Sequence, residues 1–420
     1  MLDQADRLAA AASGANGGAI APDMHLLTDS AAFVAFGRRS RDLYREWDDA
    51  WSGAIGLWPT RWLNLFPPGA GPLVSRQTPP AAPAPPVSPS TPSPPAPPAA
   101  SPAPARFPAP TSPTPASFPA PASPALASFP APASPTPATF PAPTSPAPSS
   151  FAEPSSPAAS SSTAPPSPAA PSSPSSLRLP AELREVSADE VALLEPDVRV
   201  PEGGTAVLVE GQLGVNPQRL VAVLAGHAGS VVTGVRMLDV TVRGDRVVAV
   251  RTTAGDFTPG AVVMATGLLP RPWRTRQRWI KGHMIAVAPG PWRLGSVLGG
   301  PLGGGTPLPD GTILCGGTFD DGDLSPAVRE EIADPMAQAL AAVLPKAAGA
   351  RISHRWCCFR PYIEGRQPVV DRLPGVRNGW FAGGHFTTGI MMAAATGEAV
   401  ASWIGGSGTP DLVTSFTLAR

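Results

Sequence analysis

The residues best placed to hold a ligand lie near the C-terminus, where an apolar run leads into two glycines. The sequence predicts a strand over 380–385 that ends in this glycine turn, followed directly by a small-residue helix from Gly389 to Ile404. The first turn of a helix carries N–H groups without intrahelical partners and the positive end of the helix dipole. The order strand, glycine turn and helix therefore predicts a site for an electron-rich group.

Residues that bind metals or form disulfides show no such pattern. The five histidines, at positions 25, 227, 283, 354 and 385, have no ligand spacing with cysteines or carboxylates, so we predict no metal site. Only three cysteines occur and two of them, Cys357 and Cys358, are adjacent, which is typical of a protein from a reducing compartment.

Charge and hydropathy exclude several classes of partner. Lys and Arg together number 31, as do Asp and Glu, so no basic excess favours nucleic acid or an anionic membrane. No apolar run approaches the ~20 residues that span a bilayer, and no basic segment followed by an apolar one opens the chain. We expect a cytoplasmic protein.

A proline-rich segment interrupts the chain. Residues 78–176 hold 35 of the 59 prolines, and phenylalanine recurs every 11 residues from Phe107 to Phe151. Proline fixes φ and lacks an N–H donor, so we expect a disordered spacer in polyproline II conformation. Two interpretations follow: a repeat expanded inside a tolerant loop, or a ligand for the aromatic groove of a proline-rich-motif-binding protein. The absence of charged specificity residues in the regular unit favours the first.

The remainder has an α/β texture. We expect helices over 30–51, 187–195, 218–229 and 326–344, of which the second starts with a capping box at Ser187 and Glu190. We expect strands over 231–235, 237–242, 247–252 and 261–265, a fully buried strand over 262–267, and a hairpin at the Asp-Gly pair 310–311.

Motifs in a fixed order resemble the FAD-dependent D-amino acid oxidase superfamily, and within it the glycine oxidase and sarcosine oxidase branch. They are GQLGVNP at 211–217, VVMATG at 262–267, KGHM at 281–284, GTILCGGT at 311–318, WCCFRP at 356–361 with PVV at 368–370, and GGHFTTGI at 383–390 through ATG at 395–397. The segment ASGANGG at 12–18, after Asp3, matches the loop that follows the second Rossmann strand. The resemblance covers residues 1–66 and 177–420 and lies in the order of many weak motifs.

The resemblance implies an α/β fold in which a Rossmann-like FAD-binding domain is interleaved with an antiparallel-sheet substrate domain, and the proline-rich repeat interrupts both. The implied boundaries are 1–30, 205–275 and 375–420 for the FAD-binding domain, 31–77, 177–204 and 276–374 for the substrate domain, and 78–176 for the repeat.

The resemblance also implies a flavoenzyme that takes a hydride from the Cα of a small amino acid or N-methyl amino acid, with oxygen as the expected acceptor and an amino acid dehydrogenase as the alternative. Arg360 matches the arginine that binds the substrate carboxylate, for which a guanidinium fork is well suited. His283 and Tyr362 lie on the substrate side, and Phe386 is a second candidate for the pocket wall. The implied FAD-binding residues are Asp3, Ser13, Asn16, Gly17, Ala265, Thr266, Gly267, Gly384, His385, Gly389, Ile390 and Met391.

Each of these residues also has a purely structural interpretation. Arg360 would form a surface ion pair, and His385 would be a structural imidazole whose hydrogen bonds are satisfied. Residues 265–267 would form a tight turn, and Asp3 would be a solvated carboxylate. Cys357 matches a flavin-linking cysteine by its offset from Arg360, or is a small buried hydrophobe.

The sequence departs from the family pattern at its start, which corresponds to the acid that binds the ribose, without the Gly-x-Gly-x-x-Gly turn before it. We expect a translation start placed too late; the alternative is a truncated relative that binds no FAD and acts as a scaffold through its repeat.

Overall fold

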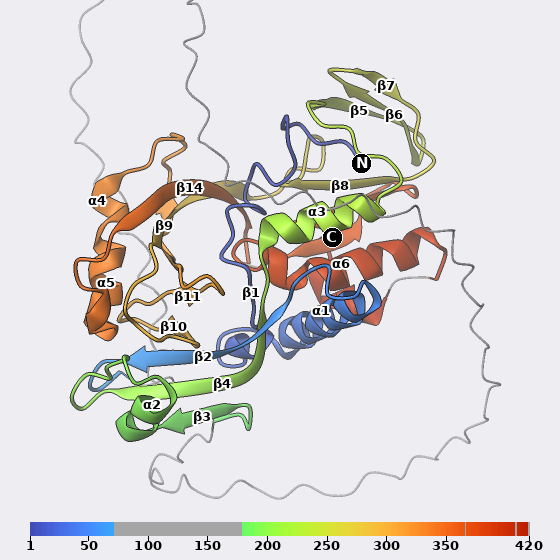
Figure 1. Ribbon diagram of the computed structural model, residues 1–420. Helices are drawn as coiled ribbons and strands as arrows, with labels where there is room; N and C mark the ends of the chain where they lie inside the picture. Colours follow the sequence, from blue (N-terminus) through green and yellow to red (C-terminus); the bar gives the residue numbers. More distant parts are fainter. Residues whose placement is uncertain (71–178, 366, 408–409, 419–420) are drawn as a thin grey trace, which may run out of the picture. The chain divides into compact units, whose positions relative to one another are not determined.

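The computed structural model describes residues 1–70, 179–365, 367–407 and 410–418, and all statements below concern these residues. They fall into one compact unit of mixed α/β structure with four sheets (Figure 1). The predicted proline-rich segment 78–176 lies outside the described residues. The domain boundaries given above remain predictions.

The longest strand pair belongs to the sheet that carries the substrate-side motifs. All of its neighbouring strands are antiparallel, and β9 at its centre pairs with β12, β13 and β14. Its strands are β9 (Gln277–Val287), β11 (Thr306–Pro307), β12 (Ile313–Gly316), β13 (Asp320–Asp321) and β14 (Ile352–Ile363). The predicted Asp-Gly hairpin is confirmed, because β11 and β12 pair across it.

A second five-stranded sheet is organised around the long strand β4. Strand β10 runs parallel to β2 and all other pairs are antiparallel. Its strands are β1 (Ala19–Ile20), β2 (Trp58–Phe66), β3 (Leu183–Val186), β4 (Thr205–Gly214) and β10 (Val297–Gly299). This sheet shares an apolar core with β9 and β12 and with α5 (Pro335–Val343).

The third sheet has the mixed pairing expected of a Rossmann-like half. Strand β16 (Gly379–Gly383) runs parallel to β8 (Val262–Gly267) and antiparallel to β15 (Val369–Arg372). The prediction of a fully buried strand over 262–267 is wrong. Only Met264 is buried and Val263 is 42% exposed, because β16 is the one strand that pairs with β8 among the described residues.

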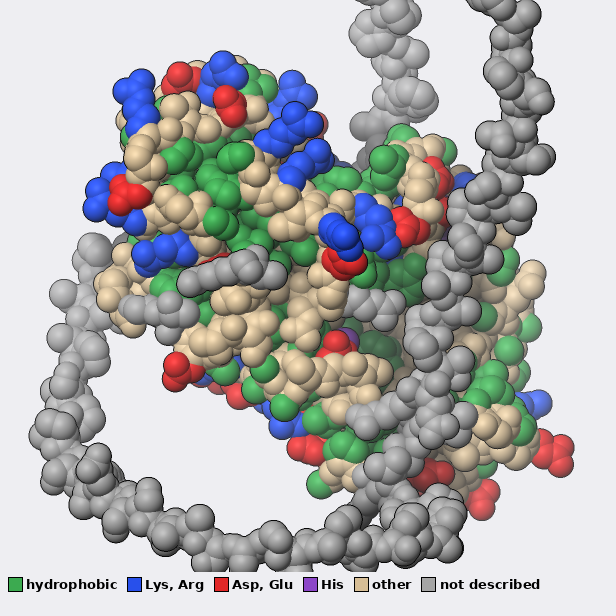
Figure 2. All heavy atoms as spheres, turned by 180° about the vertical axis from the view of Figure 1, so that it is seen from behind, with side chains coloured by type: hydrophobic (Ala, Val, Ile, Leu, Met, Phe, Trp, Pro, Cys, Tyr) green, Lys and Arg blue, Asp and Glu red, His purple; other side chains and the backbone are tan. Residues whose placement is uncertain are grey.

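The fourth sheet is a small antiparallel meander of β5 (Met237–Arg243), β6 (Arg246–Thr252) and β7 (Gly255–Phe257). One side packs on a core that includes Val240 and Val250, while Leu238 and Phe257 are exposed. Lys and Arg side chains gather at the surface of this part of the chain in Figure 2. The strand predicted over 231–235 is reduced to a single parallel bridge between Leu2 and Val232.

Two helices lie side by side, α1 (Ala31–Ala50) and α6 (Gly389–Ile404) (Figure 1). The hydroxyl of Tyr44 donates to the carbonyl oxygen of Ile390 at 2.7 Å. The buried Ser40 Oγ accepts from the Ala395 N–H at 3.3 Å. Helix α1 thus holds α6 by polar contacts as well as by a shared apolar core.

The remaining helices are short. They are α2 (Ala188–Leu194), α3 (Pro217–His227), α4 (Glu330–Ala333) and the 3-10 helices Pro22–His25, Pro345–Ala347 and Asp411–Phe416. The capping box is confirmed, with Ser187 and Glu190 bonded reciprocally. The single helix predicted over 326–344 is wrong, since it starts at Glu330 and breaks into α4 and α5 before Pro335, whose ring cannot continue the α4 ladder.

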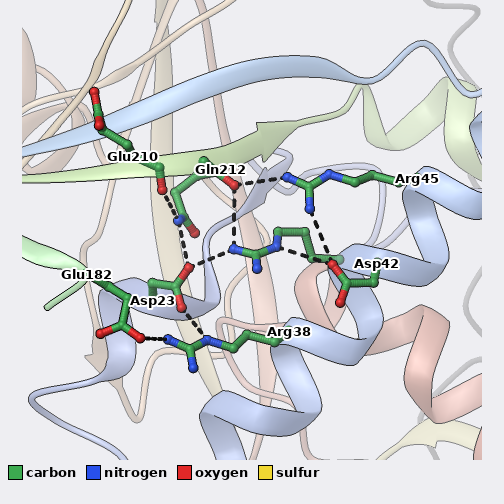
Figure 3. A network of polar contacts seen from close by, with 9 residues as sticks. Asp23, Arg38, Asp42, Arg45, Glu182, Glu210 and Gln212 are labelled. Carbon is green, nitrogen blue, oxygen red and sulfur yellow. Dashed lines mark hydrogen bonds and ion pairs between the residues drawn. The ribbon is translucent and has the colours of Figure 1, made fainter. Parts of the chain in front are cut away.

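A buried ion-pair network joins the middle of α1 to the 3-10 helix Pro22–His25 and to β4. The Asp23 carboxylate, 6% exposed, accepts from Arg38 Nε at 2.5 Å, Arg41 Nη1 at 2.7 Å and Gln212 Nε2 at 2.9 Å. Figure 3 shows Asp23 between Arg38 of α1 and Gln212 of β4. Burial alone would raise the pKa of Asp23, but these hydrogen bonds and the charge of Arg41 hold that pKa below its ordinary value.

Candidate functional site

The N-terminus of α6 presents backbone donors that no protein group caps. The first intrahelical bond runs from the Met392 N–H to the Thr388 carbonyl, and the N–H groups of Gly389, Ile390 and Met391 have no partner among the described residues. A Cβ built on Gly389 would meet nothing nearer than His385 Cβ at 3.8 Å. The predicted donors therefore lie together at the start of the helix, and a side chain at Gly389 would make only an ordinary contact there.

The ends of β8 and β16 meet just before this helix. The Gly384 N–H donates to the Gly267 carbonyl at 2.7 Å, and both glycines have positive φ, +67° and +77°. A side chain at Gly384 would strike Ile363. Ala265 and Thr266 are exposed on β8, with the Thr266 hydroxyl turned back to the Leu268 carbonyl at 2.7 Å.

His385 is held by the helix that follows it. Its Nε2 lies 3.0 Å from the Thr396 hydroxyl, and burial lowers the pKa of the imidazole to about 4. A neutral ring is therefore expected at physiological pH. His385 also forms a bridge with Tyr362, which brings the end of β14 to the glycine turn.

The predicted loop 12–18 lies against β9 and β14, the longest strands of the sheet that carries the substrate-side motifs. Trp356 Nε1 donates to the Ala15 carbonyl at 3.1 Å, and a Cβ on Gly17 would lie 3.7 Å from Met284 Cε. A cavity of about 390 Å³ opens between this loop, the N-terminus of α3 and β14, with Asn16, Gly17 and Trp356 in its lining. Its volume is within the range of small-molecule pockets.

Asp3 and Ser13, the first two predicted cofactor-binding residues in the chain, do not line this cavity. The backbone of Asp3 pairs with Val232 and Val235, and its Oδ1 accepts from the Ala5 N–H at 2.9 Å. Ser13 is exposed, and Asn16 Oδ1 accepts from the Gly18 N–H at 2.8 Å. Only Asn16 and Gly17 of this group line the cavity.

Arg360 is a buried cation without an acidic partner. Its side chain lies over Gly282 of β9, where any Cβ would collide with the guanidinium. Nη1 donates to the Thr318 carbonyl at 2.7 Å, the residue is 9% exposed, and no carboxylate among the described residues lies within ion-pair distance. Desolvation lowers the pKa of Arg360, but a guanidinium remains charged at working pH. The alternative interpretation of Arg360 as a member of a surface ion pair is therefore wrong, and its binding of a carboxylate stays a prediction.

The other two predicted catalytic residues lie on different faces of the sheet. Successive residues of a strand point to opposite faces, so His283 projects away from the face on which Arg360 covers Gly282. His283 is fully buried and its Nε2 accepts from the Arg329 N–H at 3.2 Å, while burial and the charges of Lys281 and Arg329 lower its pKa.

Tyr362 lies two residues from Arg360 on the same strand and on the same face. Cys357 occupies the face of His283, with its Sγ 3.3 Å from the Pro326 carbonyl.

Sequence reasoning missed Phe319 and gave no role to Gly282. The Phe319 ring lies 5.0 Å from Arg360 Cζ and 5.6 Å from the ring of Phe386. A lone aromatic residue in a run of Gly and Asp was the available signal for Phe319. Nothing in the sequence indicated that Gly282 leaves room for Arg360, because the two meet only across paired strands.

The arrangement of sheets and helices is similar to that of two solved structures. The solved structure of glycine oxidase from Geobacillus kaustophilus superposes with a TM-score of 0.68 at 17% identity, covering 100% of this chain and 91% of that one. L-proline dehydrogenase from P. horikoshii has a TM-score of 0.51 over 56% of this chain and 67% of its own. At these identities the likeness concerns the fold.

The FAD dependent oxidoreductase (DAO) family matches residues 171–403, and the chain belongs to this family. A glycine oxidase of Pseudomonas aeruginosa is 26% identical over 169 residues, which are 39% of this chain and 46% of that protein. A D-amino-acid oxidase of Bradyrhizobium diazoefficiens is 24% identical over 239 residues, 53% of this chain and 56% of its own length. The chain thus spans about half the length of these curated relatives.

FAD is the cofactor of this family, and two observations fit it to the described residues. The first three N–H groups of α6 have no partner among the described residues, so they are available to an electron-rich ring or phosphate. The cavity beside Asn16 and Gly17 is large enough for part of a dinucleotide. Among the described residues the α6 donors, Gly267, Asn16 and Gly17 would be the ones to hold it.

Proposed function

We propose that this protein is an FAD-dependent oxidoreductase that oxidises the C–N bond of a small amino acid or N-methyl amino acid, with oxygen as electron acceptor. The observation that carries the proposal is the uncompensated charge of Arg360. A buried cation without a carboxylate is costly unless a ligand neutralises it. A substrate carboxylate would supply the missing charge through two parallel hydrogen bonds.

The residues around Arg360 would fix the orientation of that substrate. Thr318 holds one guanidinium nitrogen through its carbonyl, which leaves the other donors for the ligand. Tyr362 and Phe386 wall the same face of the sheet. His283, on the opposite face, would act as a positioning residue that fixes Thr318 and the Arg329 backbone.

When bound, FAD would supply the acceptor for the hydride of the substrate Cα; water would hydrolyse the imine, and oxygen would take the two electrons and become hydrogen peroxide. The N–H groups of Gly389, Ile390 and Met391 would stabilise negative charge next to them, by the logic of an oxyanion hole. The neutral His385 keeps its hydrogen bond to Thr396 and adds no competing positive charge at that end of the helix.

The first experiment is the visible spectrum of the purified chain, followed by acid precipitation. A flavin spectrum whose colour leaves with the supernatant is expected. Colour that stays with the pellet would make Cys357 the linking residue. A colourless protein that gains no flavin on incubation with FAD would contradict the proposal and favour a relative that acts as a scaffold through its repeat.

The second experiment tests Arg360 by substitution. Arg360→Ala should raise KM for amino acids by about 100-fold or more, since a charge-assisted bidentate contact is lost. Arg251→Ala is the control, because Arg251 is an exposed arginine on β6 paired with Asp239 at 3.5 Å. An unchanged KM in Arg360→Ala would remove the anchoring role.

A further inference from the structure

The rings of three aromatic residues form a continuous row beside the Arg360 guanidinium. Phe319 stacks against Arg360, Phe386 lies 5.6 Å from Phe319, and Tyr362 meets Phe386 edge-on at 5.3 Å. We call the rings of Phe319, Phe386 and Tyr362 the aromatic wall. Its far end is closed by Arg278, whose guanidinium lies 4.5 Å from the Tyr362 ring.

One member of the wall is unusually open to solvent. Phe319 is 60% exposed although its ring packs on a buried cation. A large apolar side chain that stays exposed beside a buried charged group is typical of a ligand-binding surface. Since Arg360 covers part of one face of this ring, the remainder is available to a molecule bound at Arg360.

A second member is held in a strained conformation. Phe386 has φ of +51°, which is rare for a bulky residue and costs about 1–3 kcal/mol. Its N–H donates to the Pro361 carbonyl at 3.1 Å, so the backbone of β14 maintains this conformation. The strain places the ring between Phe319 and Tyr362, and strain of this kind concentrates at ligand sites.

The acidic residues near the wall are already engaged. Asp320 pairs with Arg329, Asp321 with Arg278 at 2.7 Å, and Asp323 with Lys281 at 2.7 Å. No carboxylate among the described residues is therefore left near Arg360 to accept hydrogen bonds from a primary ammonium group. Aromatic rings with no unpaired carboxylate beside them are suited to an amine whose N–H groups are replaced by methyl or methylene groups.

We propose that the aromatic wall makes this protein select N-alkylated amino acids over glycine. The inference rests on the proposed function in that Arg360 binds the substrate carboxylate. The amine of an α-amino acid is two bonds from the carboxylate carbon, so a carboxylate on Arg360 brings the amine to the wall. N-methyl groups then pack on Phe319 and Phe386, whereas a primary ammonium loses its hydration there without gaining acceptors.

The test measures binding to the full-length protein by titration calorimetry, with glycine and N,N-dimethylglycine as probes. N,N-dimethylglycine should bind about tenfold more tightly than glycine, the discrimination that one or two methyl contacts allow. Phe319→Leu should remove most of this difference, because the leucine side chain offers no ring to the N-methyl groups. Phe257→Leu is the matched control, because Phe257 is exposed on β7 in a different sheet and should change neither affinity.

The outcomes separate this proposal from the one on which it rests. Equal affinities for the two probes, or an unaltered ratio in Phe319→Leu, would overturn the selectivity of the wall. If Arg360→Ala still abolished binding of both, carboxylate anchoring would stand. Binding that survives Arg360→Ala would refute both proposals. Since Phe319 is largely exposed, its leucine variant should fold, and a wild-type unfolding midpoint checks this.

Discussion

The substitution Asp23→Asn removes the charge at the centre of the network that joins the middle of α1 to β4, while keeping the shape of the side chain. Asp23 is 6% exposed and receives hydrogen bonds from Arg38, Arg41 and Gln212. An asparagine oxygen can retain only part of these bonds, and its NH2 group would face donors. Among carboxylates, Arg38 would then keep only its contact with Glu182 at 2.8 Å, and Arg41 only its longer contact with Asp42 at 3.7 Å (Figure 3).

The magnitude follows from how far each partner is buried. Breaking a buried pair costs about 3–5 kcal/mol, whereas exposed pairs are worth about 0–1 kcal/mol. Arg41 is 15% exposed and lies near the first limit, while Arg38 is 35% exposed and lies between the two. We therefore expect Asp23→Asn to lower the free energy of unfolding by about 3 kcal/mol.

Asp42→Asn is the matched control, since Asp42 is 52% exposed and pairs with Arg45 at 3.3 Å and, more loosely, with Arg41 at 3.7 Å. It should cost no more than about 0.5 kcal/mol. Urea denaturation gives both values from the midpoint and slope. A loss for Asp23→Asn within about 1 kcal/mol of that for Asp42→Asn would refute the reasoning from burial.

Acid pH provides a second readout of the same group. The pKa of Asp23 is lower in the folded protein than in the unfolded chain. Asp23 therefore contributes fully to the free energy of unfolding at pH values above its unfolded pKa, and this contribution is lost as pH falls through its folded pKa. The difference in stability between wild type and Asp23→Asn should accordingly be constant near neutral pH and shrink below about pH 4. A difference that did not shrink would mean that the charge of Asp23 is not what stabilises the network.

Two further predictions concern the candidate site. Gly282→Ala would place a Cβ against the Arg360 guanidinium, so carboxylate affinity should fall by about 100-fold in a calorimetric titration; Gly226→Ala, whose Cβ meets no atom within 4 Å, should leave affinity unchanged. His385 has a pKa of about 4 in the folded protein, below its unfolded value of about 6.5. The unfolded chain therefore binds one more proton between these values, and stability should fall by about 1.4 kcal/mol per pH unit as pH drops from about 6.5 to about 4. The free energy of unfolding of His385→Gln should depend less steeply on pH over this range. An identical pH dependence in wild type and variant would mean that a group other than His385 titrates.

Local signals in the sequence predicted most of the elements correctly. The capping box at Ser187, the glycine turn before α6 and the Asp-Gly hairpin depend on a few neighbouring residues and were confirmed. The prediction for β8 failed because distant parts of the chain decide its burial, which depends on the strands that flank it. The prediction over 326–344 failed for a local reason, because the helical pattern was interpreted as continuous although Pro335 lies within it.

The candidate site shows the same division. Arg360 and the donors of α6 lie within motifs of known order, whereas the face on which a side chain projects depends on strand alternation. Cys357, at an odd offset from Arg360, falls on the opposite face, as does His283 relative to Gly282. Phe319 joined the site only through contacts across β9 and β14, which no spacing in one sequence encodes.

The start of α6 is held in a way that keeps its donors free. Thr388 occupies the N-cap position, but its hydroxyl donates to the His385 carbonyl at 2.9 Å instead of accepting from the helix. The position of the helix is fixed instead by Tyr44 and Ser40 of α1. Helix ends usually gain about 1 kcal/mol from a side-chain cap, and here that contribution is absent while the end is still rigidly placed. A rigid helix end without a cap is preorganised for a ligand, because binding there requires neither displacement of a protein group nor ordering of the backbone.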